Sequence, residues 1–151
     1  MTTRIDGIAG LKERIGDHLG YSEWHEVTQE QVNLFADATG DHQWIHVDIG
    51  RAKAGPFGGP IAHGYLTLSL TPALLSEILE VSGISMAVNY GLNKLRFPAP
   101  VPVGSKVRAG VQLDQLEYVS GGVQVTLTTT FEVEGGSKPV CVAEILFRYY
   151  S

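Results

Sequence analysis

The chain has 151 residues, of which 44% are hydrophobic and 18% charged, and its net charge is −5 at pH 7. This length predicts one domain, residues 1–151, large enough to bury a core without disulfide or metal support. The acidic balance argues against nucleic acid as a partner, because phosphate backbones require a basic face. No apolar run reaches the ~18–20 residues of a membrane-spanning helix, so we expect no membrane partner.

Two short elements are expected before residue 28. Apolar residues at helical spacing predict an amphipathic helix over residues 7–19, although two internal glycines weaken the pattern. Gly20 is expected to end this helix, and weak alternation predicts a first strand over residues 21–27.

A second helix is marked by signals at both ends. Thr28 and Gln31 form a capping box, and Gly40 stands where a helix C-terminal glycine belongs. Asp41 is therefore expected just past a helix end, on a tight turn. Asp48 is expected to cap a further short turn of helix.

A loop and a long apolar stretch follow. Residues 54–60, with the sequence AGPFGGP, cannot form regular structure and are a candidate gate. Over residues 61–82, apolar side chains recur at helical spacing on nearly every face, which predicts a buried helix. Pro72 is expected to kink this helix, and Ser82 and Gly83 are expected to end it.

The remaining chain alternates in hydrophobicity and predicts strands over residues 85–97, 106–118, 123–134 and 140–150. An antiparallel meander around one apolar helix is an α+β fold. A meander leaves strand edges unpaired, so we expect a homodimer related by a two-fold axis. The only cysteine, Cys141, predicts a buried thiol and fits a reducing, cytoplasmic compartment.

Asp41 and His46 are the first candidates for chemistry. A turn brings them to one side, where a carboxylate and an imidazole that titrates near neutral pH can share a water or a substrate proton. The alternative is a helix-capping aspartate and a partly buried structural histidine. Spacing alone leaves both interpretations open.

A metal site is a further alternative for the same segment. His42 and His46 lie four residues apart, and Asp48 and His63 complete a possible set of ligands. The segment lacks the glutamate of a His-Glu-x-x-His motif, however, and Gly40 argues against a helix here. We therefore expect no metal.

Gly64 falls near the start of the predicted helix, where the first backbone N–H groups have no intrahelical acceptor. Without a side chain, it allows a ligand carbonyl to approach, and the helix dipole favours the charge that develops on the oxygen. The alternative is a glycine required for close packing, and His63 is expected to tie down the preceding loop. Lys94 and Arg96 point to the same side of one strand and are either solvated or in contact with a substrate phosphate.

The run ATGDHQWIHVDIGRA resembles the hydratase motif of MaoC-like proteins, which include (R)-specific enoyl-CoA hydratases and 3-hydroxyacyl-thioester dehydratases. The motif consists of Gly-Asp, a later Asn-Pro, an aliphatic residue, His, and a small residue six beyond the His. Gln43-Trp44 replaces the usual Asn-Pro. The stretches GGPIAHGYLTLSL and LNKLRFPAPVPVGS are also similar, so the likeness covers nearly the whole chain. The matching motif residues are Gly40, Asp41, Ile45, His46 and Ala52.

The resemblance implies a hot-dog fold, in which an antiparallel sheet wraps a long central helix and dimerises through its edges. It also implies reversible hydration of trans-2-enoyl thioesters to (3R)-3-hydroxyacyl thioesters in fatty-acid metabolism, with a CoA thioester as substrate and no cofactor. Asp41 and His46 would hold the reacting water, and the N–H of Gly64 would bind the thioester oxygen. Residues expected to support the site are Gln43, Trp44 and His63, and those expected to contact substrate are Tyr65, Lys94 and Arg96.

Two other functions on the same fold stay open. A hot-dog thioesterase commonly carries a carboxylate near the start of the central helix, whereas the first acid here is Glu77, late in its course. A non-catalytic subunit that binds acyl thioesters is the other alternative, and the intact pair of Asp41 and His46 argues against it.

Overall fold

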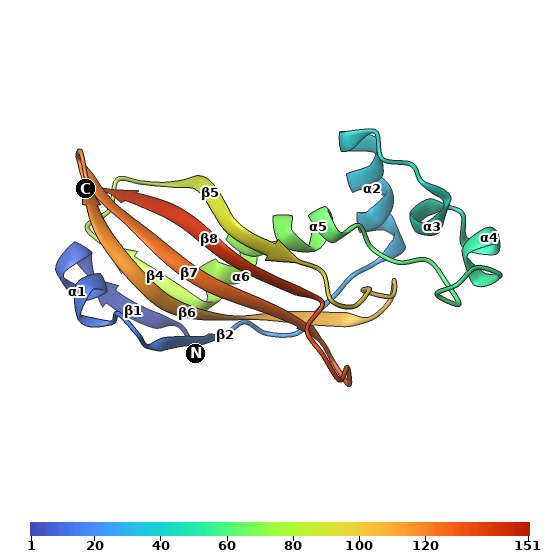
Figure 1. Cartoon of the computed structure of the whole chain (residues 1–151), viewed down its shortest axis with the longest axis horizontal. Helices are drawn as coiled ribbons and strands as arrows, with labels where there is room; N and C mark the ends of the chain where they lie inside the picture. Colours follow the sequence, from blue (N-terminus) through green and yellow to red (C-terminus); the bar gives the residue numbers. More distant parts are fainter.

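The computed structural model describes all residues from Met1 to Ser151. Its largest element is a six-stranded antiparallel sheet that curves around helix α6 (Figure 1). The order is β2-β6-β7-β8-β5, and β3 also pairs with β6. A separate parallel pair joins β1 (Thr3–Asp6) to β4 (Leu79–Ser82). The strands of the large sheet are β2 (His18–Tyr21), β3 (His25–Glu26), β5 (Met86–Arg96), β6 (Lys106–Val119), β7 (Gly122–Val133) and β8 (Cys141–Tyr150).

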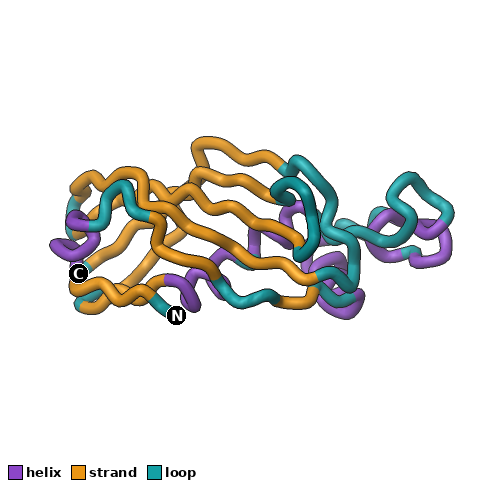
Figure 2. The backbone as a smooth tube through the Cα atoms, turned by 90° about the horizontal axis from the view of Figure 1, so that it is seen from below, coloured by secondary structure: helices purple, strands orange, loops and turns teal.

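The helices fall into groups with different surroundings. Helices α5 and α6 lie along the sheet, whereas α2, α3 and α4 extend beyond its end, as Figures 1 and 2 show from two directions. Residues 28–60, which contain α2, α3, α4 and the loop after them, are called the overhang below. The helices are α1 (Gly7–Glu13), α2 (Gln29–Thr39), α3 (Trp44–Val47), α4 (Ile49–Lys53), α5 (Gly64–Ser69) and α6 (Thr71–Ile78).

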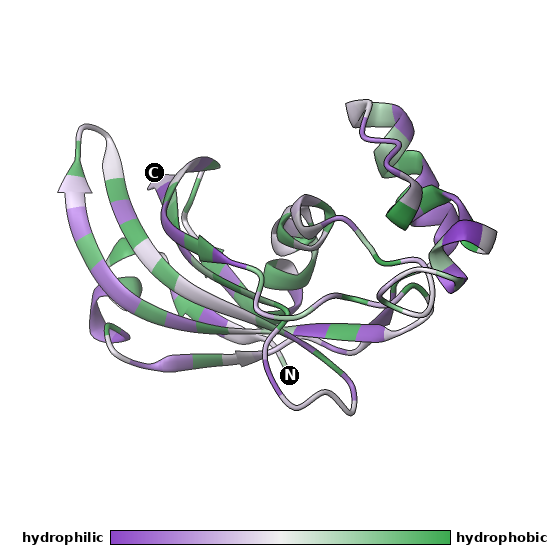
Figure 3. Ribbon diagram, turned by 45° about the vertical axis from the view of Figure 1, so that its right-hand side comes forward, coloured by the Kyte–Doolittle hydropathy of each residue, from purple (hydrophilic) through white to green (hydrophobic).

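The core lies between α6 and the inner face of the sheet. Hydrophobic and hydrophilic residues alternate along the strands (Figure 3), because successive side chains of a strand point to opposite faces. On β7, the inward side chains of Val125, Leu127 and Phe131 are completely buried, as is Ile78 of α6. The burial of these side chains is the main source of stability on this side of the molecule.

Several predictions from the sequence are confirmed. The Thr28 side chain accepts from the Gln31 N–H, and Gly40 closes α2 in the left-handed conformation at φ 83°. Asp48 caps α4 by accepting from the Arg51 N–H. The mixed α+β class and the antiparallel sheet are also as expected, and Cys141 is buried, which raises the pKa of its thiol to about 12. The structure contains no helix with the length and hydrophobicity needed to cross a membrane.

The prediction of one buried helix over residues 61–82 is wrong. The chain forms α5 and α6, and Leu79–Ser82 is the strand β4. Pro72 lies in the first turn of α6, where its missing N–H would have no intrahelical acceptor, so it begins a helix instead of kinking one. One side of both helices faces solvent, and it includes Tyr65 and Ala73.

The predicted boundaries near the N-terminus are also wrong. Helix α1 ends at Glu13, and Gly16 adopts φ 93°, which a right-handed helix cannot contain. His18–Tyr21 then pairs with β6, so Gly20 lies inside a strand and does not end a helix. The predicted strand over residues 21–27 is reduced to the end of β2 and the short β3.

The predicted meander holds for β6, β7 and β8 but not for β5. Strand β5 pairs with β8 at the opposite edge of the sheet from β2 and β3, and it does not pair with β6. The proline-rich stretch after Arg96 carries the chain across the sheet before β6 begins. Strand β5 is therefore an edge, and most of its residues are exposed.

Candidate active site

Asp41 is placed by the end of α2. The Gly40 N–H donates to the Ala36 carbonyl at 2.8 Å, and the left-handed conformation of Gly40 turns the chain away from the helix axis. The Asp41 carboxylate is exposed, and its nearest donor, the Gln43 N–H, lies at 3.4 Å. The carboxylate is thus available to a molecule that enters from outside.

His46 lies on α3 with only 6% of its surface exposed. Its Nδ1 lies 2.6 Å from the Ile61 carbonyl oxygen. Because a carbonyl only accepts, Nδ1 must carry the proton, which leaves the lone pair on Nε2. Burial lowers the pKa of His46, the Ile61 carbonyl opposes this shift, and neighbouring His63 adds to it. A neutral imidazole with a free Nε2 is the form that a general base requires.

His63 connects the two segments. It occupies the N-cap position of α5 without a capping side-chain bond and is 3% exposed, and its Nε2 donates to the Asp41 backbone carbonyl at 2.9 Å. Its ring stacks on that of His46, with the centroids 3.9 Å apart and the planes at 25°. Its Nδ1 is buried without a hydrogen-bond partner. His63 therefore contacts both the Asp41 turn and the His46 ring and fixes their relative position.

Asp41, His46 and His63 each contribute one donor atom to a group whose members lie within 4.8 Å of one another. The two imidazoles stack with their planes at 25°, and each ring already uses one nitrogen in a hydrogen bond to a backbone carbonyl. A metal needs lone pairs that converge on a point ~2.0–2.2 Å from each ligand atom. A carboxylate and an imidazole this close can also hold a water between them, and the expected absence of a metal stays a prediction.

Two residues weighed as metal ligands lie elsewhere. His42 bonds to Asp37 at 2.9 Å on the surface, and that hydrogen bond raises the pKa of His42. The Asp48 carboxylate accepts from the Arg51 N–H at 3.1 Å. Neither side chain joins the group around His46.

Gly64 is the first residue of α5, and its N–H has no acceptor within the helix. A Cβ added at this position would lie 2.8 Å from the Phe97 ring. Both interpretations of this glycine therefore have support. The absence of a side chain is required for close packing against Phe97, and the backbone N–H is available to a ligand carbonyl. Gly64 and His46 line the same pocket, of about 280 Å³.

Most of the pocket wall is apolar and was not predicted from the sequence. The sequence feature that could have marked Phe57 as a pocket residue is its position in the glycine- and proline-rich loop. For Phe97 the feature is its position beside the proline-rich connection. The pocket is lined by His46, Phe57, Ile61, Ala62, Gly64, Thr67, Phe97, Pro98, Ala99, Pro100, Val101 and Val140.

Gln43 and Trp44 occupy the start of α3. Gln43 is the N-cap residue, but its side chain makes no capping bond. The Trp44 ring packs against Gly55, where an added Cβ would lie 2.9 Å from the ring, and the Arg51 guanidinium lies 4.3 Å from the ring centroid. Trp44 thus contacts the loop instead of filling the turn between Asp41 and His46.

Three residues expected to contact substrate lie outside the pocket. Tyr65 is 65% exposed and meets Phe97 edge-on, with the ring centroids 6.0 Å apart. Lys94 forms an exposed ion pair with Glu144 at 3.6 Å, and Arg96 donates to the carbonyl of Leu95. Contacts of these three residues with a substrate stay a prediction.

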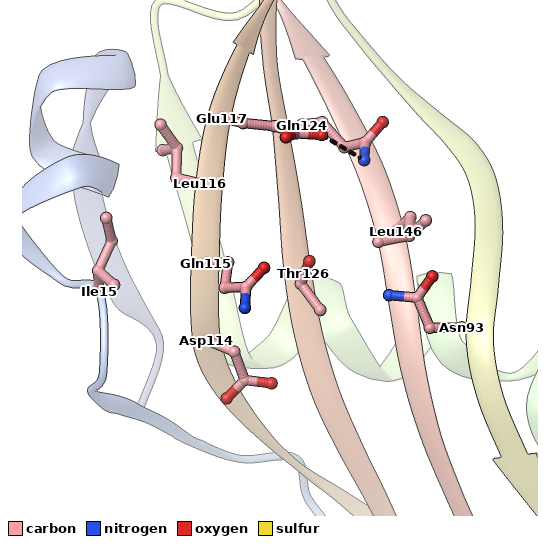
Figure 4. Close-up of a pocket in the computed structure, with 9 residues that line it drawn as sticks. All are labelled: Ile15, Asn93, Asp114, Gln115, Leu116, Glu117, Gln124, Thr126 and Leu146. Atoms are coloured by element: carbon pink, nitrogen blue, oxygen red, sulfur yellow. Dashed lines mark hydrogen bonds between the residues drawn. The ribbon is translucent and has the colours of Figure 1, made fainter.

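A larger hollow of about 460 Å³ lies on the outer face of the sheet, away from α6 (Figure 4). Both of its carboxylates are already paired, since Glu117 accepts from Gln124 at 3.0 Å and Asp114 accepts from Thr128. It contains no imidazole and no free backbone N–H at a helix start. The smaller pocket beside His46 is therefore the candidate site.

Comparisons with known proteins indicate the family of the chain. A family model described as a MaoC like domain matches residues 11–134. The chain is 58% identical to 3-hydroxyacyl-thioester dehydratase Z of Mycobacterium tuberculosis over 96% of this chain and 97% of that protein. It is 32% identical to the (R)-specific enoyl-CoA hydratase of Aeromonas caviae over 87% of each. A solved structure of an (R)-hydratase from A. caviae aligns over 88% of this chain and 94% of that one, with a TM-score of 0.72 and 28% identity.

Proposed function

The chain belongs to the MaoC-like domain family, and from this premise we propose that it is an (R)-specific enoyl-thioester hydratase and 3-hydroxyacyl-thioester dehydratase. The observation that carries this proposal is the buried His46, whose Nδ1–H is held by Ile61 and whose ring has a nitrogen within 4.8 Å of an Asp41 carboxylate oxygen. A lone pair held there next to an exposed carboxylate provides two groups that can hold one water.

In the hydration direction, we assign the water proton to His46. As Nε2 takes this proton, the water oxygen bonds to C3 of the enoyl thioester, and the C2–C3 electron pair moves toward the thioester oxygen. The proton that His46 takes passes to the Asp41 carboxylate, which delivers it to C2 as the electron pair returns from the thioester oxygen. The sum is one water added, with no change in the enzyme.

The thioester oxygen is assigned to the Gly64 N–H. This group has no intrahelical acceptor and lines the same pocket as His46. Loss of such a donor typically costs ~2.7–4 kcal/mol of barrier. The reaction as written involves no net oxidation or reduction, and we accordingly propose that no cofactor takes part. We also propose that a CoA thioester is the substrate, with Lys94 and Arg96 near its phosphates.

Helices α5 and α6 offer no support for a thioesterase. Their only carboxylate is Glu77, which bonds to His25 at 2.7 Å and to the Glu23 N–H at 3.0 Å. Glu77 is therefore used to hold β3 and the chain before it, and it is absent from the pocket that contains His46.

The test is an assay with crotonyl-CoA that follows the enoyl absorbance and, in parallel, free thiol with a thiol reagent. We expect the absorbance to fall without thiol release, and chiral chromatography of the hydrolysed product to give the (3R) acid. Thiol release at the same rate as loss of substrate would support a thioesterase. Binding of the acyl-CoA without any turnover would support a non-catalytic subunit.

We also propose that the chain forms a homodimer through β5. This strand pairs only with β8, and its other edge is unpaired along 11 residues. Met86, Tyr90 and Leu92 are more than 40% exposed on it. A long apolar edge is a template for pairing with an identical strand. Light scattering should give twice the chain mass for the wild type and the chain mass for a Met86→Lys, Leu92→Lys variant, and a monomeric wild type would contradict the proposal.

A further inference from the structure

The loop after α4 is held by one aromatic ring. The Trp44 ring lies against the backbone of Gly55, so close that a Cβ at this position would come within 2.9 and 3.1 Å of two ring carbons. The Arg51 guanidinium stacks on the same ring at 4.3 Å from its centroid. Arg51 is in turn fixed through its N–H, which is capped by Asp48. Arg51, Trp44 and Gly55 thus form one packed stack.

Gly55 begins the turn that carries Phe57. The Gly58 N–H donates to the Gly55 carbonyl at 3.3 Å, which closes a four-residue turn with Pro56 in its second position. Pro56 presets the turn, and Gly58 leaves it at φ 73°, a conformation that favours glycine. Phe57 is therefore presented from a turn whose first residue rests on the Trp44 ring.

Phe57 forms part of the wall of the reactive pocket, together with His46 and Gly64. The pocket measures about 280 Å³, which is below the ~300–1,000 Å³ of most small-molecule sites. Phe57 is 49% exposed, so it lines the pocket at the surface of the molecule. A side chain in this position limits how much acyl chain the pocket can hold.

We propose that Phe57 is a specificity-determining residue that restricts the enzyme to short acyl chains, and that Trp44 is the residue that positions it. The inference rests on the proposed hydratase function. Trp44 stands where the family motif has proline, and it is two residues before His46 on the four-residue helix α3. The position of the loop and the position of the catalytic base are thereby set by the same helix.

The test compares octenoyl-CoA with crotonyl-CoA as substrates, using the ratio of their kcat/KM values. Phe57→Ala should raise this ratio by ~10-fold or more, because each methylene accommodated in an apolar pocket is worth ~10–200-fold. Trp44→Ala should raise it less, and Trp44→Phe, which keeps a ring over Gly55, should restore part of the wild-type preference. Gly55→Ala should act as Trp44→Ala does, because its Cβ displaces the ring from the other side.

A double variant and a control decide whether Trp44 acts through Phe57. If it does, the Phe57→Ala, Trp44→Ala enzyme should have the same ratio as Phe57→Ala alone, whereas additive shifts would show that the two act independently. Tyr118→Ala removes an aromatic ring that is 66% exposed at the far end of β6, and it should leave the ratio unchanged. A wild-type ratio in Phe57→Ala would overturn the proposal.

Calorimetric binding of butyryl-CoA and octanoyl-CoA, which lack the reactive double bond, gives a readout that does not depend on turnover. The wild type should prefer butyryl-CoA, and Phe57→Ala should narrow or reverse that preference. If the wild type hydrates no enoyl-CoA but Phe57→Ala still narrows or reverses the binding preference, the hydratase proposal fails and the role of Phe57 stands. If hydration proceeds and neither ratio changes in Phe57→Ala, only the role of Phe57 fails.

Discussion

Strands β6, β7 and β8 pair along nearly their whole length, and their inner face contributes much of the buried core. The overhang, in contrast, buries only Val32, Ala36, His46 and Ala52 among its 33 residues, 28–60. Polar contacts hold it instead. Gln29 donates to the His46 carbonyl at 2.8 Å, the Ile61 N–H donates to the Ile45 carbonyl at 3.0 Å, and His63 holds the Asp41 carbonyl.

This difference separates stability from activity. Apolar burial is non-directional and scales with area, so it gives the sheet its stability without fixing any one atom finely. Hydrogen bonds and stacked rings contribute less free energy but define positions, which is what a pair such as Asp41 and His46 requires. Changes in the sheet should therefore reduce stability, and changes in the overhang should reduce activity.

The largest expected effect on stability comes from Phe131→Ala in β7. The Phe131 side chain is fully buried, so its removal should lower the free energy of unfolding by ~3–5 kcal/mol, measured by urea denaturation. Phe57→Ala, which removes the same ring from the overhang, should lower it by much less, because Phe57 is 49% exposed. Equal losses for the two variants would contradict the contrast between the regions.

A smaller effect is expected for Gln29→Met. This variant loses the donor to the His46 carbonyl and the bond to Asn33 at 2.9 Å, but it also removes a buried oxygen without a partner. We expect the free energy of unfolding to fall by about 1 kcal/mol. The value of kcat/KM for crotonyl-CoA should fall by more, up to ~10²-fold, if α3 shifts by ~1 Å.

Gln124→Met is the matched control for this prediction. Gln124 is also half-buried and bonds to Glu117 at 3.0 Å and to Arg148 at 2.9 Å, but it lies on the outer face of the sheet. Its replacement should leave kcat/KM unchanged. An equal loss of activity in the two glutamine variants would show that position in the overhang is not what matters.

The cap of α2 offers a perturbation of stability of similar size, without the expected loss of activity. Thr28→Ala removes the acceptor for the Gln31 N–H, which should cost about 1 kcal/mol of stability in thermal or urea unfolding. Thr28→Ser keeps the hydroxyl and should stay close to the wild type. A Thr28→Ala protein as stable as Thr28→Ser would mean that α2 does not depend on its cap.

The smallest effect is the contribution of His46 to the pH dependence of stability. Burial lowers its pKa in the folded protein, so the folded state binds fewer protons than the unfolded state between that pKa and the unfolded value of ~6.5. This stability is fully present above ~6.5 and is lost as the pH falls through the folded pKa. The free energy of unfolding of His46→Gln, measured with urea, should therefore fall less steeply between about pH 7 and 5 than that of the wild type. A steeper fall in the variant would contradict this prediction.

The sequence predicted local features better than long-range ones. The caps at Thr28, Gly40 and Asp48 depend on a few neighbouring residues, and all three are present. The pairing of β5 with β8 joins residues far apart in the chain, and a period-two pattern does not say which strand is the neighbour. The break between α5 and α6 does not follow from the apolar periodicity, because proline is compatible both with a kink inside a helix and with the first turn of a new one.

The candidate site was predictable in part for the same reason. Asp41, His46 and Gly64 were marked by the resemblance, and the structure brings them to one pocket or its edge. The Asp41–His63 bond and the stack of Trp44 on Gly55 depend on how separate turns pack, which residue spacing does not encode. The tautomer of His46 likewise follows only from the Ile61 carbonyl 15 residues away.

The most direct test of the central claim measures activity and stability together in Asp41→Asn and His46→Gln. We predict that each variant loses hydration of crotonyl-CoA by ~10²-fold or more, the usual contribution of a positioned acid or base, while its unfolding free energy stays within about 1 kcal/mol of the wild type. Near-normal turnover in both variants, or a loss of activity matched by unfolding, would contradict the assignment of Asp41 and His46 as the reacting pair.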